Sequence, residues 1–154
     1  MQTDYIDLLL VHWPDDRPVP QVLKDFELLK KAGITRHIGV SNFSIRQMRE
    51  ALASGIVVYN HQFHIYPGSV NRELITYCQD NHVSVTAYSP LDEGRVVNDR
   101  KLSEAARQQG ITPARAALKQ LLALGLIVIP KASKREHLEE NFAALSGGDR
   151  DGQS

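Results

Sequence analysis

The stretch YIDLLLVH, residues 5–12, decides the first element of the fold. Apart from Asp7 it is apolar at consecutive positions, which is typical of a strand buried on both faces of a parallel sheet. The next stretch, VPQVLKDFELLKKAG at 19–33, has apolar residues at helical spacing and closes on Gly33, a signal for the end of a helix. A short strand is expected next, at HIGVSNF, residues 37–43. The order of strand, helix and strand indicates an α/β protein.

This alternation continues along the chain, with further strands expected at 56–63, 83–91 and 126–133. Further helices are expected at 44–55, 72–81, 101–110, 112–125 and 134–145. Ser44 and Thr112 stand where two of these helices begin, and their hydroxyls are suited to cap the first turn. Ser133 followed by Glu136 predicts a capping box at the start of the last helix. We expect one domain over 1–145 and a disordered Gly-, Asp- and Ser-rich tail over 146–154.

Strand-helix units of roughly 30 residues predict a parallel sheet with right-handed crossovers. Two folds are compatible with this: an open doubly wound sheet, or part of a closed TIM (β/α)8 barrel with five parallel strands and flanking helices. A polar or aromatic residue follows each strand, namely His12, Ser41 with Asn42, Gln62, Tyr88 and Lys131. A barrel brings all strand ends to one mouth, whereas an open sheet uses only those at its switch point. The pattern favours the barrel.

Composition excludes several classes of partner. Lys plus Arg and Asp plus Glu both number 18, so no overall charge favours nucleic acid or a membrane surface. Cys78 is the one cysteine, which excludes an internal disulfide and indicates a buried small apolar residue in a reducing cytoplasm. The N-terminal residues lack a basic region, and no apolar run is long enough to cross a membrane. We therefore expect a cytoplasmic protein.

Four segments carry a specific resemblance. DYIDLLLVHWP at 4–14, IGVSNF at 38–43, AYSPL at 87–91, and IPKAS at 129–133 with EEN at 139–141 resemble the aldo-keto reductase family, in the family's order and spacing. The resemblance implies the fourth to eighth strands of its barrel, and a nicotinamide cofactor extended across the barrel mouth. It also implies a small carbonyl substrate, such as an aldehyde or ketone, and reduction by hydride transfer.

The resemblance assigns roles to residues near the nicotinamide. Ser41, Asn42 and Gln62 would hold its carboxamide, since amide side chains supply both donors and acceptors. Tyr88 would stack on the nicotinamide ring. Ser89 and Leu91 would line the path of the pyrophosphate.

The other end of the cofactor would lie at the last helix. Its basic start and free backbone N–H groups suit a phosphate. The resemblance assigns the 2′-phosphate of NADP and the adenine to this region, to Lys131, Ser133, Lys134, His137, Glu140 and Asn141. His137 stands where the family often has Arg, and a neutral imidazole holds phosphate less well than a guanidinium. NADP is the expected cofactor, with NAD as the alternative.

Of the family's four catalytic groups, only the histidine that orients the carbonyl maps here, as His12. The Tyr, Lys and Asp belong to segments that would precede residue 1, so we expect a truncated C-terminal fragment with weak or no activity alone. A shortened gene, a made fragment and one half of a complementing pair remain open as explanations. The unpaired edges of its first and last strands predict self-association.

Two other readings of function remain open: a non-catalytic NADP-binding or interaction module, and an unrelated barrel enzyme with a phosphate site. His61 and His64 lie three apart in an expected strand and therefore point to opposite faces. We predict no metal site.

Overall fold

A computed structural model describes residues 3–145 of the protein. The predicted tail at 146–154 lies outside the described residues. Five strands form one sheet in the order β1-β2-β3-β4-β5, with bounds Ile6–Val11, Thr35–Ser41, Asn60–His64, Ser84–Tyr88 and Ile127–Ile129. The pairing of β1 with β2 and of β2 with β3 is parallel. A doubly wound sheet reverses its strand order at a switch point, whereas a barrel keeps sequential order. The observed order therefore decides for the barrel type of winding.

The helices alternate with the strands as predicted. They are α1 (Val19–Lys31), α2 (Ile45–Ala53), α3 (Arg72–Asp80), α4 (Arg100–Gln108), α5 (Pro113–Leu122) and α6 (Arg135–Ala143). An unexpected 3-10 segment, η1 (Asp92–Asn98), separates β4 from α4. Its backbone has positive φ at Glu93 and Gly94, so it cannot continue as a regular helix.

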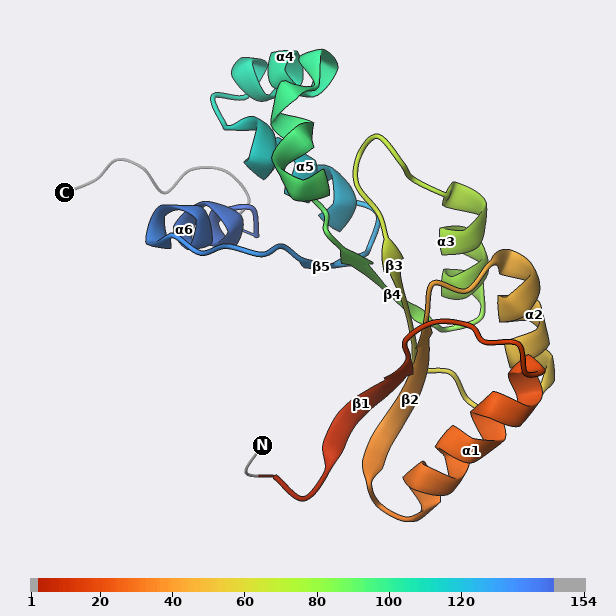
Figure 1. Ribbon diagram of the computed structural model, residues 1–154. Coiled ribbons are helices and arrows are strands. Elements are labelled where there is room, and N and C mark those ends of the chain that lie inside the picture. The colour runs from red at the N-terminus through yellow and green to blue at the C-terminus, as the bar shows by residue number, and fades with distance from the viewer. Residues whose placement is uncertain (1–2, 146–154) are drawn as a thin grey trace. The chain divides into compact units, whose positions relative to one another are not determined.

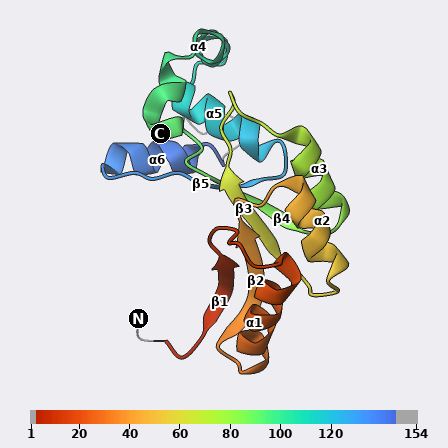
Figure 2. The ribbon, with the colours of Figure 1, turned by 45° about the vertical axis from the view of Figure 1, so that its right-hand side comes forward.

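The described residues form two compact units. The N-terminal unit runs to Phe63 and includes Asn71–Thr86; the C-terminal unit comprises His64–Val70 and the described residues from Ala87 onward. In the N-terminal unit, α1, α2 and α3 lie on the same side of the strands (Figures 1 and 2). Its core contains fully buried apolar side chains of both layers, among them Leu23, Ile38, Val40, Met48 and Val85. The C-terminal unit has its own apolar cluster of Val96, Leu102, Ala106, Ala116 and Ala117.

The start signals of two helices are confirmed. Ser44 caps α2 and forms a reciprocal capping box with Gln47, and Thr112 caps α5 ahead of Pro113. The predicted capping box of Ser133 and Glu136 is wrong, because α6 begins one residue later than expected. Lys134 is its N-cap, in extended conformation and without a side-chain cap bond. The third helical residue is then His137, which cannot complete a capping box.

Several predicted strands are shorter than expected, and one is less buried. β3 begins at Asn60 rather than at 56, β4 ends at Tyr88 rather than at 91, and β5 covers three residues. In β1 the side chains of Leu8, Leu9 and Leu10 are half-buried and only Val11 is buried, so its predicted burial on both faces is wrong. The helices of this unit cover one side of the strands, and the described residues pair β1 with β2 alone. No helix within residues 3–145 has the length and apolar character that crossing a membrane requires.

Candidate cofactor site

The polar residues after β2 and within β3 meet as predicted. Ser41 pairs in register with Gln62, and the backbone N–H of Asn42 donates to the Gln62 carbonyl at 2.9 Å. The Asn42 side-chain amide donates to Ser41 Oγ at 3.0 Å and to the carbonyl oxygen of His12 at 3.1 Å. We call Ser41, Asn42 and Gln62 the amide cluster. It joins the carboxyl ends of three successive strands.

The backbone at this turn is unusual. Asn42 has φ of 61°, in the left-handed region that non-glycine residues seldom adopt. Ser89, the residue directly after β4, has φ of 47°. Both residues were predicted to contact a cofactor, and strained backbone of this kind concentrates at functional sites because the surrounding structure must hold it.

A buried histidine lies behind the amide cluster. His61 Nε2 accepts the backbone N–H of Phe43 at 3.1 Å, and its Nδ1 lies 3.6 Å from Cys78 Sγ. Both side chains are fully buried. Burial lowers the pKa of His61 to about 4 and raises that of Cys78 to about 11. The interpretation of Cys78 as a buried, apolar-like residue is confirmed. The contacts of His61 were not predicted, because they depend on the strand register.

His12 contacts the cluster through its backbone carbonyl, as described above, while its side chain is exposed. Its imidazole lies 6.1 Å from the ring of Trp13, centroid to centroid, at 54°. Trp13 is itself 59% exposed. The His12 imidazole is therefore open to solvent, directly after the carboxyl end of β1.

The C-terminal unit holds a cavity of about 520 Å³, which we call the nucleotide cavity. Six residues predicted to bind the cofactor line it: Ser89, Leu91, Lys131, His137, Glu140 and Asn141. Its volume lies within the range of small-molecule sites. Residues from the end of β4, the segment after β5 and α6 thus meet around one space, which a shared ligand site requires.

Further residues of the nucleotide cavity were not predicted. Pro90, Glu93, Gly94, Val97, Ala114 and Pro130 complete its wall. The Thr112 hydroxyl, at the start of α5, donates to the Glu140 carboxylate of α6. This bond fixes one lining residue from a neighbouring helix, and only the fold brings the two together. Ser133 and Lys134 do not line the cavity.

Tyr88 is half-buried and stacks on His64, with ring centroids 5.5 Å apart and planes at 10°. His64 Nε2 lies 3.7 Å from Asp92 Oδ1, and Arg95 donates to the same oxygen at 3.0 Å. The Asp92 carboxylate raises the pKa of the Arg95 guanidinium. His61 is buried and His64 exposed, which agrees with the prediction that the two point to opposite faces.

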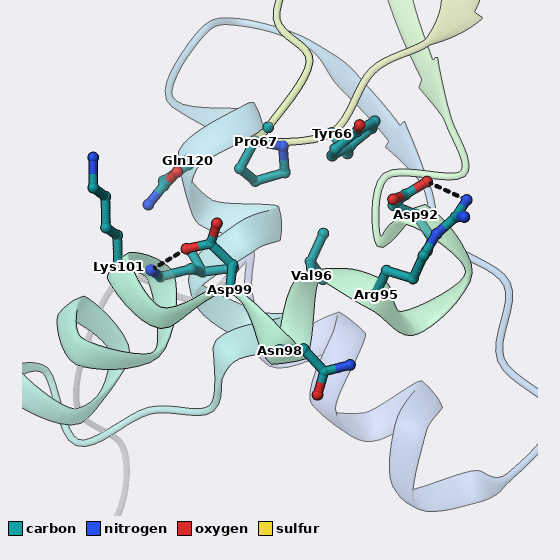
Figure 3. Close-up of a pocket in the computed structure, with 11 residues that line it drawn as sticks. Tyr66, Pro67, Asp92, Arg95, Val96, Asn98, Asp99, Lys101 and Gln120 are labelled. Carbon is teal, nitrogen blue, oxygen red and sulfur yellow. Dashed lines mark hydrogen bonds and ion pairs between the residues drawn. The ribbon is translucent and has the colours of Figure 1, made fainter.

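A second cavity of about 480 Å³ lies in the same unit (Figure 3). Its acidic groups are engaged within the protein, since Asp92 binds Arg95 and Asp99 accepts the Leu102 N–H at 2.7 Å. None of the residues predicted to bind cofactor lines it. Of these two cavities, only the nucleotide cavity is lined by residues that the sequence assigned to the cofactor. Among residues 3–145, no group of three or more His, Cys, Asp or Glu side chains is arranged to hold a metal ion.

The sequence of residues 1–147 matches the profile of the aldo/keto reductase family. The chain belongs to the aldo/keto reductase family. It is 34% identical to methylglyoxal reductase DkgB of Escherichia coli O157:H7, over 94% of this chain and 56% of that protein. The structure resembles aldose reductase from Schistosoma japonicum, with a TM-score of 0.86 and 32% identity over 94% of this chain and 54% of that one.

A second solved aldo-keto reductase, from Klebsiella pneumoniae and in complex with NADPH, matches with a TM-score of 0.85 and 30% identity. The match covers 94% of this chain and 54% of that chain. The chain spans about half the length of the curated relatives it matches. Its five parallel strands and flanking helices are accordingly the corresponding part of the aldo-keto reductase (β/α)8 barrel.

Proposed function

We propose that this aldo-keto reductase chain binds NADP and serves the reduction of small aldehydes and ketones to alcohols. One observation carries the proposal: six residues assigned to the cofactor from sequence line a single cavity in the C-terminal unit. They come from three separate segments, so composition alone does not explain their meeting.

The nucleotide cavity has the chemistry that a phosphate-bearing adenosine needs. Lys131 supplies a cation, and His137 lies in the first turn of α6. No side chain of the N-cap closes this helix start, so its backbone N–H groups suit an anion. Glu140 and Asn141, one turn further along, suit the polar edge of the adenine. We propose NADP as the cofactor, with NAD binding more weakly.

The nicotinamide end is proposed to contact the amide cluster and Tyr88. Ser41, Asn42 and Gln62 would bind the carboxamide, and the Tyr88 ring would pack on the nicotinamide. When bound, the cofactor supplies the hydride for carbonyl reduction. The exposed His12 imidazole would orient the carbonyl oxygen, where negative charge develops and a hydrogen-bond donor stabilises it. The methylglyoxal reductase similar to this chain suggests small dicarbonyls as substrates.

A non-catalytic NADP-binding module is the second candidate. It is favoured by the nucleotide cavity, whose lining residues would bind a cofactor whether or not reduction follows. Such a module would keep the nucleotide cavity and lack the general acid that carbonyl reduction requires.

Two measurements on the purified chain separate these functions. The protein is mixed with NADPH and methylglyoxal, and nicotinamide absorbance is followed for turnover. NADPH fluorescence is recorded separately for binding. Turnover supports the reductase, while a fluorescence change without turnover supports the module. The absence of both turnover and a fluorescence change, at high cofactor concentration, would refute both functions.

Three further assignments are part of the proposal. We propose that residues 1–145 act as one part of a barrel and that the chain works in the cytoplasm, where its free thiol stays reduced.

We also propose self-association through β1 and β5, the first and last strands of the sheet order. Light scattering should then give a mass above that of one chain, and a monomer at high concentration would contradict this.

A further inference from the structure

The buried ring of His61 lies between two parts of the N-terminal unit. On one side, Nε2 accepts the Phe43 N–H, in the turn that carries Ser41 and Asn42. On the other side, Nδ1 faces the thiol of Cys78 on α3 at 3.6 Å. The ring also packs against Phe63, with centroids 4.6 Å apart. His61 thus connects the turn of the amide cluster to the core.

These contacts fix the chemical form of the ring. A nitrogen that accepts an N–H hydrogen bond carries no proton, so Nε2 is the bare nitrogen. The proton of the neutral ring is then on Nδ1, directed at the Cys78 sulfur. A protonated ring would present an N–H to the Phe43 N–H, and burial already disfavours its charge. The arrangement therefore requires a neutral ring with its proton on Nδ1.

The turn depends on this acceptor. Phe43 is 3% exposed, so its N–H cannot turn to water instead. The residue before it, Asn42, holds a left-handed φ of 61°, a conformation that persists only when neighbouring contacts determine it. Contacts on both sides supply this: the Asn42 N–H donates to Gln62, and the next N–H donates to His61.

We propose that His61 is a positioning residue for the nicotinamide: by accepting the Phe43 N–H it fixes the Ser41–Asn42 turn in its ligand-binding conformation. The inference rests on the proposed function, because it assumes that this turn binds the carboxamide. His61 contacts no ligand atom in this scheme. It should therefore affect the nicotinamide end of binding and leave the nucleotide cavity unchanged.

A matched pair of variants tests the acceptor. His61→Gln keeps an oxygen or nitrogen acceptor at the position of Nε2, whereas His61→Met has nearly the same length with only a weakly accepting thioether sulfur. Each is titrated with NADPH and with 2′-phospho-ADP-ribose, which lacks the nicotinamide. We expect His61→Met to weaken NADPH binding about tenfold, the usual effect of leaving a buried donor unpaired, with 2′-phospho-ADP-ribose unchanged. His61→Gln should restore most of the NADPH affinity.

The outcomes distinguish this inference from the proposed function. If the wild-type chain binds neither ligand, the proposed function fails, and the inference fails with it. If it binds both, and the Met variant keeps wild-type NADPH affinity or loses both ligands equally, only the inference is overturned. Nitrogen NMR of the wild-type chain provides a test that needs no variant to fold. A neutral His61 protonated at Nδ1 supports the inference, and a proton at Nε2 overturns it.

Discussion

The phenol ring of Tyr88 and the imidazole of His64 are stacked, with centroids 5.5 Å apart and planes inclined by 10°. Tyr88 ends β4 and His64 ends β3, so neighbouring strand ends hold the two rings against each other. His64 is in turn 3.7 Å from Asp92. The tyrosine assigned to the nicotinamide is therefore held in place by a ring from the adjacent strand.

Replacing Tyr88 with Ala should weaken NADPH binding by about two- to tenfold, the range expected for loss of one aromatic stack. Tyr59→Ala is the matched control, because Tyr59 also stacks on a histidine, His37, at 4.2 Å but lies outside the predicted site. Fluorescence titration measures both. Equal affinities in the two variants would exclude a stacking role for Tyr88.

Lys131→Ala should weaken NADPH binding more than NADH binding, because only NADPH carries the 2′-phosphate that this cation is proposed to bind. The loss of NADPH affinity should exceed the loss of NADH affinity by about tenfold, as expected for loss of a charge-assisted hydrogen bond. Lys101, which lines the second cavity of the same unit, gives the control variant Lys101→Ala. If Lys131→Ala weakens both cofactors alike, the phosphate assignment is wrong.

Local signals predicted the elements well. The alternation of apolar runs, and the caps at Ser44 and Thr112, depend on neighbours in sequence, and the structure confirms them. The start of α6 was misplaced because Lys134 adopts an extended backbone. No neighbouring residue in the sequence indicates this conformation. The segment η1 was missed for a similar reason, since its positive φ values fall partly on Glu93, a residue type that rarely adopts them.

Of the site, sequence predicted residue identities better than contacts. Family motifs pointed to the six residues of the nucleotide cavity. They gave no sign of the bond from Thr112 to Glu140 or of the His64–Tyr88 stack, since both join elements far apart in the chain. His61 lies outside the motifs altogether, and its importance follows only from the register that places it beside Phe43.

Stability should fall as the pH is lowered from about 6.5 to about 4, in part because of His61. Its pKa drops from the ordinary 6.5 to about 4 on burial, so in this window the unfolded chain binds a proton that the folded chain does not. The free energy of unfolding therefore rises with pH across the window, by roughly 3 kcal/mol at most from this group. Urea unfolding at several pH values measures it.

His61→Gln is the control for this pH dependence, because it removes the titrating group and keeps an acceptor. Other groups titrate in the same range, so the comparison of wild type with this variant is decisive. The variant should show a smaller loss of stability between pH 6.5 and 4. Parallel curves for the two proteins would mean that His61 titrates normally in the folded state.

Cys78 should be inert in the folded protein. Burial raises its pKa from 9.0 to about 11, so at neutral pH it is a protonated thiol with no exposed surface. A chromogenic disulfide reagent should react with it only after unfolding in urea. Between pH 9 and 11 the unfolded chain loses a proton that the folded chain keeps, so stability should fall as pH rises. Rapid labelling of the folded chain at neutral pH would contradict the buried position.

Ser44→Ala should destabilise the protein by about 1 kcal/mol, the usual value for loss of an N-cap. The Ser44 hydroxyl accepts the Gln47 N–H at 3.3 Å, while the Gln47 side chain accepts the Ser44 N–H at 2.9 Å. Gln47→Ala should therefore cost less in the Ser44→Ala background than in wild type, because the two bonds support each other. Ser69→Ala, at an exposed serine in a loop, is the control and should change the urea midpoint little. Additive effects of the two α2 variants would mean that the capping box does not form in solution.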